Sequence, residues 1–293
     1  MCWPVGKGNH RQQAVLPIII SKYPIIMKSL SVCIFILLLG TYANGQEAPV
    51  LPTDRPGQAN NPQILGINQF MIQNGITFGR TNTDNPLAAD EFKTNRFSNE
   101  LNLRYGLFEW LELNGTFIYD RFNQVQPGPS FAVDGISLLS LGVRARLFQS
   151  TNGRTVISLL GLVDTDFVSE VFSTNSYLLR ARLLASHQVS DQLSLTLNFG
   201  FSQPDALNDF YDYVVNLSYQ VSTRASVFIE LYGQGLLNNR DFFSVDNTFY
   251  DGGLMYLINN SLSLDLSAGY AANFNGAVTE YFVSAGVSYR LGQ

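Results

Sequence analysis

The chain between residues 66 and 291 repeats one pattern, in which apolar and polar side chains alternate residue by residue. A period of two places successive side chains on opposite faces of a β-strand. In one segment Leu262, Leu264 and Leu266 take one face while Ser263 and Asp265 take the other. No segment shows a sustained period of 3.6, so no helix is predicted. The alternation predicts twelve strands, at residues 66–79, 98–106, 111–120, 137–147, 155–164, 176–187, 193–202, 210–219, 225–234, 248–257, 261–271 and 280–291.

The length of these segments indicates a membrane. Strands of soluble proteins average about 5–6 residues, whereas a tilted strand needs about 9–11 residues to cross a bilayer. The connections alternate between long and short, and the two longest span residues 80–97 and 121–136. Outer-membrane barrels have long external loops and short periplasmic turns. We therefore predict an all-β fold, a transmembrane antiparallel up-and-down β-barrel of about 12 strands in the outer membrane of a Gram-negative bacterium.

The two faces of the predicted strands differ in charge. A lipid-facing Arg at mid-bilayer costs roughly 2–4 kcal/mol, so charged side chains on the strands are expected to face the lumen. The apolar faces are almost free of charge, and the opposite faces carry ten candidates for lumen-lining residues. These are Glu100, Arg104, Glu112, Arg144, Arg146, Arg180, Arg182, Glu230, Asp265 and Arg290.

The arginines of this set allow two interpretations. Their planar guanidinium groups suit carboxylate and phosphate, so a row of arginines in a narrow barrel could form a track for an anionic solute. Alternatively, they pair with the carboxylates of the same set and fill the lumen. The sequence alone favours the second interpretation, because twelve strands enclose a narrow interior.

The N-terminal 45 residues predict a leader that is separate from the fold. After Met27 come Lys28, an apolar run over Leu30–Gly40 and the small residues Ala43-Asn44-Gly45, which together are typical of a signal peptide cleaved between Gly45 and Gln46. The apolar run is shorter than the roughly 20 residues of a membrane-spanning helix. Residues 1–26 are either an upstream mis-annotated start or an unusually long leader.

The mature part excludes several functional classes. Charged residues make up 14% of the chain, and the leader holds four Lys or Arg and no acid, which leaves residues 46–293 at a net charge of −9. This sign excludes a basic nucleic-acid binder. Cys2 and Cys33 both lie in the leader, and His187 is the only mature histidine. Ser186 lies next to His187 and therefore on the opposite face, so no Ser-His hydrolase, metal site or cofactor is predicted, and the protein is not expected to be an enzyme.

Residues 46–63 form a lead without periodicity that contains four prolines. We interpret this lead as an extended periplasmic segment, with the barrel over residues 64–293. Its Asp54-Arg55-Pro56 motif leaves a second interpretation open, in which the lead folds into the barrel mouth as a plug or latch.

Five short motifs, in order along the chain, give a family resemblance. They are TDRPGQANNP (Thr53–Pro62), NELNLRYGLFEWLELN (Asn99–Asn114), VFIELYG (Val227–Gly233), YDGGLMYLINNSLSLDLSAGY (Tyr250–Tyr270) and GVSYRL (Gly286–Leu291). Together they resemble the outer-membrane proteins of the MetA-pathway phenol-degradation family over most of 53–291. The resemblance implies a transporter-like β-barrel, and the family name implies uptake of aromatic compounds, although phenol itself is not carried over to this chain. The chain departs from such barrels at its end, where Tyr289 precedes Leu291 and no aromatic residue is terminal.

The function expected from the sequence is a channel or transporter for passive passage of small solutes through a narrow polar lumen. The expected partners are outer-membrane lipid, the barrel insertion machinery, and small solutes of anionic or aromatic character. The alternative is a non-conducting structural or adhesive barrel whose long external loops, 80–97 and 121–136, bind a partner.

Overall fold

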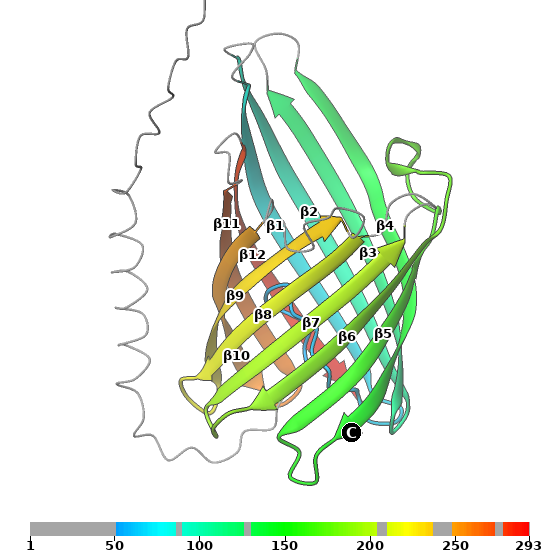
Figure 1. The fold of residues 1–293 in the computed structure, drawn as a ribbon, viewed down its shortest axis with the longest axis vertical. Coiled ribbons are helices and arrows are strands. Elements are labelled where there is room, and N and C mark those ends of the chain that lie inside the picture. The colour runs from blue at the N-terminus through cyan, green and yellow to red at the C-terminus, as the bar shows by residue number, and fades with distance from the viewer. Residues whose placement is uncertain are drawn as a thin grey trace, which may run out of the picture. The chain divides into compact units, whose positions relative to one another are not determined.

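The protein folds into a closed barrel of twelve antiparallel strands (Figure 1). The computed structural model describes residues 51–85, 90–125, 130–203, 210–236, 248–272 and 278–292. The strands are β1 (Phe70–Asn85), β2 (Asp90–Phe108), β3 (Leu111–Val125), β4 (Phe131–Gln149), β5 (Thr155–Asp164), β6 (Leu178–Gln188), β7 (Leu193–Gln203), β8 (Phe210–Gln220), β9 (Ala225–Leu236), β10 (Thr248–Asn259), β11 (Leu262–Ala272) and β12 (Val278–Leu291).

The barrel closes where the first strand meets the last. β1 pairs with β12 from Phe70 opposite Leu291 to Thr83 opposite Val278. Each of the other strands pairs with its neighbours in the sequence. Closure removes the unpaired edges that an open sheet would present. The predicted fold class and strand number are therefore confirmed.

Four strands, β1 to β4, extend well beyond the predicted ends that adjoin residues 80–97 and 121–136, and this contradicts the loops predicted there. β2 and β4 each have 19 residues, and their upper parts pair with β1 and β3. Arg80 lies opposite Asn95, and Arg121 lies opposite Asp134. Most of 80–97 and 121–136 is therefore strand, and the prediction of two long loops there is wrong. Outside the lipid both faces of a strand can be polar. Strand pairing can therefore continue beyond the point where apolar and polar residues cease to alternate in the sequence.

The two ends of the barrel differ. Connections of a few residues, at 109–110, 150–154, 189–192, 221–224 and 260–261, define what we call the turn end. At the opposite loop end, β2 to β4 rise beyond the neighbouring strands (Figure 1). A three-residue 3-10 turn, η1 (Glu170–Phe172), packs against β4 there, where the Ile136 backbone N–H donates to Ser169 Oγ at 2.9 Å. Among the described residues no helix is long and apolar enough to span a membrane.

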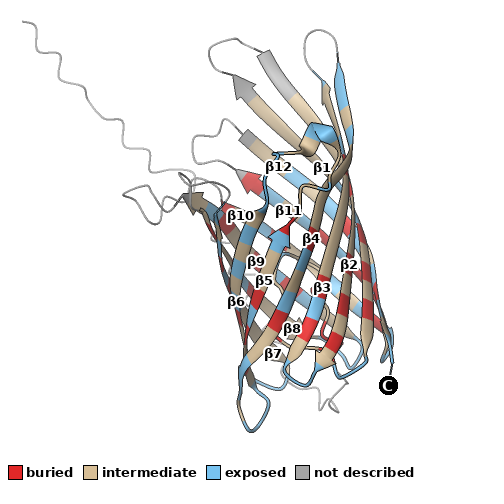
Figure 2. Cartoon of the chain, turned by 90° about the vertical axis from the view of Figure 1, so that its right-hand side faces the viewer, coloured by how far each residue is buried: buried red, intermediate tan, exposed pale blue. Residues whose placement is uncertain are grey.

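The strands bury polar side chains on the inside and expose apolar ones on the outside. Arg104, Glu112 and Ser288 are each 0% exposed. By contrast, Leu179 is 63% exposed and Val283 is 52% exposed. Figure 2 shows how buried and exposed positions change along individual strands. This is the reverse of a water-soluble protein and is the distribution that a lipid-embedded barrel requires.

The outward face predicts a depth-dependent cost of charge. Leu266 is 47% exposed near the middle of β11, and Leu147 is 59% exposed near the turn end of β4. We expect Leu266→Arg to lower the free energy of unfolding in lipid by about 2–4 kcal/mol and Leu147→Arg by about 1 kcal/mol or less. Guanidinium titration of the protein folded in vesicles measures both changes, and equal costs would contradict the assigned orientation.

Candidate functional site

The described part of the lead runs inside the barrel and contacts its inner wall. Thr53 Oγ1 lies 2.9 Å from Ser288 Oγ on β12, and Ser158 on β5 donates to the Pro62 carbonyl at 2.5 Å. Leu51 and Leu65 are 2% and 1% exposed. These contacts contradict the extended periplasmic segment for residues 51–63 and agree with the plug interpretation. Burial inside the barrel gives the polar groups of the lead partners that a free segment would lack.

A buried network of four charges holds the first part of the lead. Arg144 Nη1 and Nη2 donate to the two Asp54 carboxylate oxygens at 3.1 and 2.7 Å. Arg104 lies 3.5 Å from Asp54 and donates to Glu112 at 2.7 and 2.9 Å. Glu112 in turn accepts the Leu65 backbone N–H at 2.9 Å. Bidentate pairs of this kind are geometrically specific, and removing one member leaves a buried charge uncompensated.

The electrostatics of this network favour an ionised Asp54. Burial raises the pKa of the Asp54 carboxyl, but Arg104 and Arg144 beside it lower that pKa by more. The pKa of Asp54 therefore lies below its usual value of 3.8. The lead is consequently held by a full ion pair across the neutral range.

Arg55 occupies a notch that two glycines make in the wall. Gly75 on β1 and Gly286 on β12 lie directly opposite each other. A Cβ at either position would overlap the Arg55 guanidinium group. Arg55 Nη2 donates to Asp265 Oδ1 at 3.1 Å and to Ser284 Oγ at 2.9 Å. The missing side chains of the glycine pair therefore admit a guanidinium group next to its carboxylate.

Glu230 on β9 holds the next residues of the lead through their backbone. The Gln58 and Ala59 N–H groups donate to its two carboxylate oxygens at 2.6 and 3.0 Å. Asn216 donates to the same carboxylate at 2.8 Å. Gly57 adopts a φ of +90°, and a Cβ there would overlap the Glu230 carboxylate. Glycine is the residue that tolerates both this backbone conformation and this close approach.

The lead divides the lumen into two cavities. The loop-end cavity has a volume of about 570 Å³, and Asp54, Gly57, Gln58 and Asn60 line it. The turn-end cavity has a volume of about 270 Å³, and other lead residues, among them Thr53 and Asn61, line it. Arg55 borders both cavities. The lead is thus a partition across the barrel interior.

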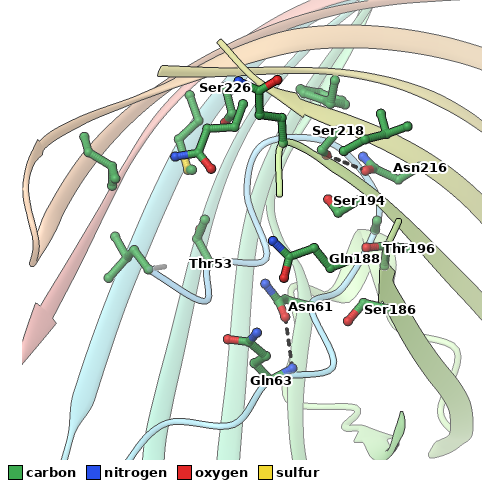
Figure 3. Close-up of a pocket in the computed structure, with 18 of the residues that line it drawn as sticks. Thr53, Asn61, Gln63, Ser186, Gln188, Ser194, Thr196, Asn216, Ser218 and Ser226 are labelled. Atoms are coloured by element: carbon green, nitrogen blue, oxygen red, sulfur yellow. Dashed lines mark hydrogen bonds between the residues drawn. The ribbon is translucent and has the colours of Figure 1, made fainter. Parts of the chain in front are cut away.

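The walls of the two cavities differ in chemistry. In the turn-end cavity, hydroxyl and amide side chains of β6 to β9 face the lead (Figure 3). The loop-end cavity is lined by charged residues together with Tyr232, Phe249 and Phe282. The rings of Tyr232 and Phe249 stack with centroids 5.2 Å apart. A solute that crosses the barrel meets charged and aromatic groups on one side of the lead. On the other side it meets mainly neutral polar groups of the strands, with Arg154, Asp191 and Arg224 in the turns.

The ten predicted lumen residues fall into three groups. Those bonded to the lead or its ion pairs are Arg104, Glu112, Arg144, Glu230 and Asp265. Glu100, Arg180 and Arg182 line the loop-end cavity, where Arg182 also donates to Asn60 at 2.6 Å. Arg146 and Arg290 lie near the turn end, where Arg290 donates to the Asn260 carbonyl at 2.9 Å. The predicted cleavage position, Gly45 and Gln46, lies outside the described residues.

Sequence reasoning missed the residues that make room for the lead. Gly75 and Gly286 sit at inward positions of alternating strands, where a polar side chain is the rule. An inward glycine on each of two strands that meet at the closure is the signal that could have marked the notch. Within the described ranges, no group of three or more His, Cys, Asp or Glu side chains could hold a metal ion.

Loss of one charge in the network is expected to release the lead. A nitroxide spin label on Gln58→Cys reports its mobility, because residues 46–293 contain no cysteine. Asp54→Asn leaves Arg144 without its carboxylate partner, at a cost of about 3–5 kcal/mol. We expect the label to change from an immobile to a mobile spectrum. Asp191→Asn, which breaks an exposed ion pair with Arg154 in the turns, is the matched control and should leave the spectrum unchanged.

Acid should release the same label. Because the pKa of Asp54 is lowered in the docked lead, its contribution to docking is complete above pH 3.8 and is lost as the pH falls through the lowered value. The spectrum should therefore stay immobile from neutral pH down to about pH 4 and become mobile only below it. Release that begins near pH 6 would show that another group controls docking.

Comparison with known proteins agrees with this fold. The structure is similar to the COG4313 outer membrane channel from Pseudomonas putida F1, with a TM-score of 0.61 and 12% identity over 81% of this chain and 99% of that chain. It is also similar to the NanC porin, with a TM-score of 0.50 and 10% identity over 74% of this chain and all of the porin chain. No curated protein matches the sequence.

The family described as "Putative MetA-pathway of phenol degradation" matches residues 53–291. The match begins at the first residue of the TDRPGQANNP motif and ends on β12, so it includes both the barrel and the described lead from Thr53 onward. The chain therefore belongs to this family.

Proposed function

We propose that the protein is an outer-membrane channel for passive passage of small solutes, and that the lead is its plug. The observation that carries this proposal is the pair of cavities, one toward each end of a closed barrel, with the lead between them. A channel of this kind needs an aqueous path through the barrel, and the two cavities supply most of that path. Displacement of the lead joins them.

The outer surface supports the placement in a membrane. Large apolar side chains are exposed on strand after strand, for example Leu141 at 57%, Leu183 at 46% and Leu264 at 46%. A soluble protein rarely exposes a contiguous apolar patch above a few hundred Å². Lipid is the partner that such a continuous band requires, and the insertion machinery of the outer membrane is the corresponding partner during assembly.

The attachment of the lead supports a plug that can move. The lead adds no strand to the barrel, so its removal leaves the ladder of strand hydrogen bonds intact. Arg144, which pairs with Asp54 of the lead, also lies near a second carboxylate in the wall. Its Nε atom is 3.5 Å from Glu112 Oε1. The wall therefore keeps part of its charge balance when Asp54 leaves, which lowers the cost of opening.

The loop-end cavity supports small solutes with an apolar part. Tyr232, Phe249 and Phe282 share its wall with Leu160 and Leu162. Pockets of several hundred Å³ with apolar walls and a few polar groups are typical of small-molecule sites. The aromatic character expected for the solutes from the family resemblance is consistent with this wall.

Opening the plug should raise conductance. We expect the purified wild-type barrel to show small or rare single-channel events in planar bilayers. The double variant Asp54→Asn/Arg55→Ala removes the three ion pairs that the lead makes with Arg104, Arg144 and Asp265, and it should raise the mean conductance several-fold. Because the barrel ladder is untouched, the variant should keep the heat-dependent gel migration of a folded barrel.

The control is the double variant Arg121→Ala/Asp134→Asn, which changes the same two charges at exposed positions that lie opposite each other on β3 and β4 and line neither cavity. It should leave the conductance of the wild type unchanged. Folded protein in which neither the wild type nor the lead variant ever conducts would defeat the channel proposal and leave the fold standing.

A further inference from the structure

The arginines of the loop-end cavity are all neutralised by neighbouring aspartates. Five arginines line this cavity, and each lies within 3.1 Å of an aspartate oxygen. The pairs are Arg55–Asp265 at 3.1 Å, Arg96–Asp120 at 2.9 Å, and Arg144–Asp54, Arg180–Asp164 and Arg182–Asp212 at 2.7 Å. No guanidinium group of this wall is left to attract an anionic solute.

Two carboxylates of the same cavity have no such partner. Glu100 on β2 and Glu280 on β12 line the cavity. In the described part of the chain neither makes a hydrogen bond or an ion pair through its carboxylate. Five positive charges are thus matched by five aspartates, and two glutamates remain in excess. When the lead leaves the barrel, Arg144 loses Asp54 and Asp265 loses Arg55, so the two wall charges that are set free have opposite signs and the excess of two glutamates stays the same.

The turn-end cavity offsets only part of this excess. The side chains that face the lead there, including Ser186, Gln188, Ser194, Thr196 and Ser218, are neutral (Figure 3). Arg154 in the turns is paired with Asp191 at 2.7 Å, and Arg224 is an exposed residue of the β8–β9 turn that has no ion pair among the described residues. One exposed arginine stands against two glutamates. The sign of the field that a permeating solute meets is therefore set in the loop-end cavity.

We propose that the open channel selects cations over anions, and that Glu100 and Glu280 are the residues that determine this selectivity. The inference rests on the proposed channel function and adds the charge of its solutes. A narrow lumen with walls of low dielectric concentrates the field of an unpaired charge, and rings of carboxylates are a recurring basis of cation selectivity. Cationic and neutral solutes pass, whereas anions are repelled.

This inference corrects the hypothesis of an arginine track for anions. That hypothesis depended on free guanidinium groups at Arg104, Arg144, Arg146, Arg180 and Arg182. The structure gives four of these an acidic partner that neutralises their charge, all except Arg146, which lies near the turn end of β4 and does not line the loop-end cavity. The residues that determine selectivity are the two glutamates that have no ion-pair partner, Glu100 and Glu280.

The reversal potential across a KCl gradient at pH 8 tests the proposal. It is measured on the wild type and on the lead variant Asp54→Asn/Arg55→Ala, and K⁺ should be favoured over Cl⁻ by roughly 3-fold or more, as expected for potentials above one kT. Adding Glu100→Gln and Glu280→Gln should bring the permeability ratio close to 1 at similar conductance.

Glu109→Gln is the matched control, since Glu109 lies in the β2–β3 turn and lines neither cavity. It should leave the permeability ratio unchanged. A channel that conducts but favours Cl⁻, or a K⁺ preference that survives the two glutamine substitutions, overturns the proposed selectivity while the channel function stands. Absence of conductance in every variant overturns the channel function and this inference with it.

Discussion

The constraint on which this structure depends is that a strand in lipid must find every backbone hydrogen-bond partner inside the protein. The chain meets this constraint by pairing β1 with β12, whose residues are about 200 positions apart. Once the sheet is closed, each strand has one face toward lipid and one toward the lumen. The lipid face must be apolar, so the charges of the strands are forced into a narrow interior. The alternation of the sequence and the crowding of charge inside the barrel have this one cause.

Charges confined in this way need partners, and the lead supplies them. Arg104 and Arg144 bring two positive charges to one region, where Glu112 alone would leave one of them in excess. Asp54 supplies the missing carboxylate, at 2.7 Å from Arg144. The lead also satisfies carboxylates of the wall. Asp265 accepts from the Arg55 guanidinium group, and Glu230 accepts from two backbone N–H groups of the lead. The lead therefore completes the interior electrostatically as well as sterically.

The strands could be predicted from the sequence because their signal is local. Alternation over ten residues is visible without any knowledge of the neighbours, and the segment 155–164 coincides with β5. The upper parts of β2 and β4 could not be predicted, since pairing above the lipid imposes no alternation. The position of the lead could not be predicted either. Its contacts join residues 90 positions apart at Asp54–Arg144 and 235 apart at Thr53–Ser288.

The five motifs that gave the family resemblance meet in the structure, because all of them contribute to the lead or to its contacts with the wall. Thr53–Pro62 is the lead, and each of the other four motifs supplies at least one residue that bonds to it. Arg104, the partner of Asp54, lies in the second motif, Glu230 in the third, Asp265 in the fourth and Ser288 in the last.

The paired arginines of β6, Arg180 and Arg182, lie outside all five motifs. Motifs that are individually weak thus form one set of contacts around the lead. These contacts say how the lead is held and nothing about the solute, so the charge of the solute is inferred from the unpaired glutamates of this chain.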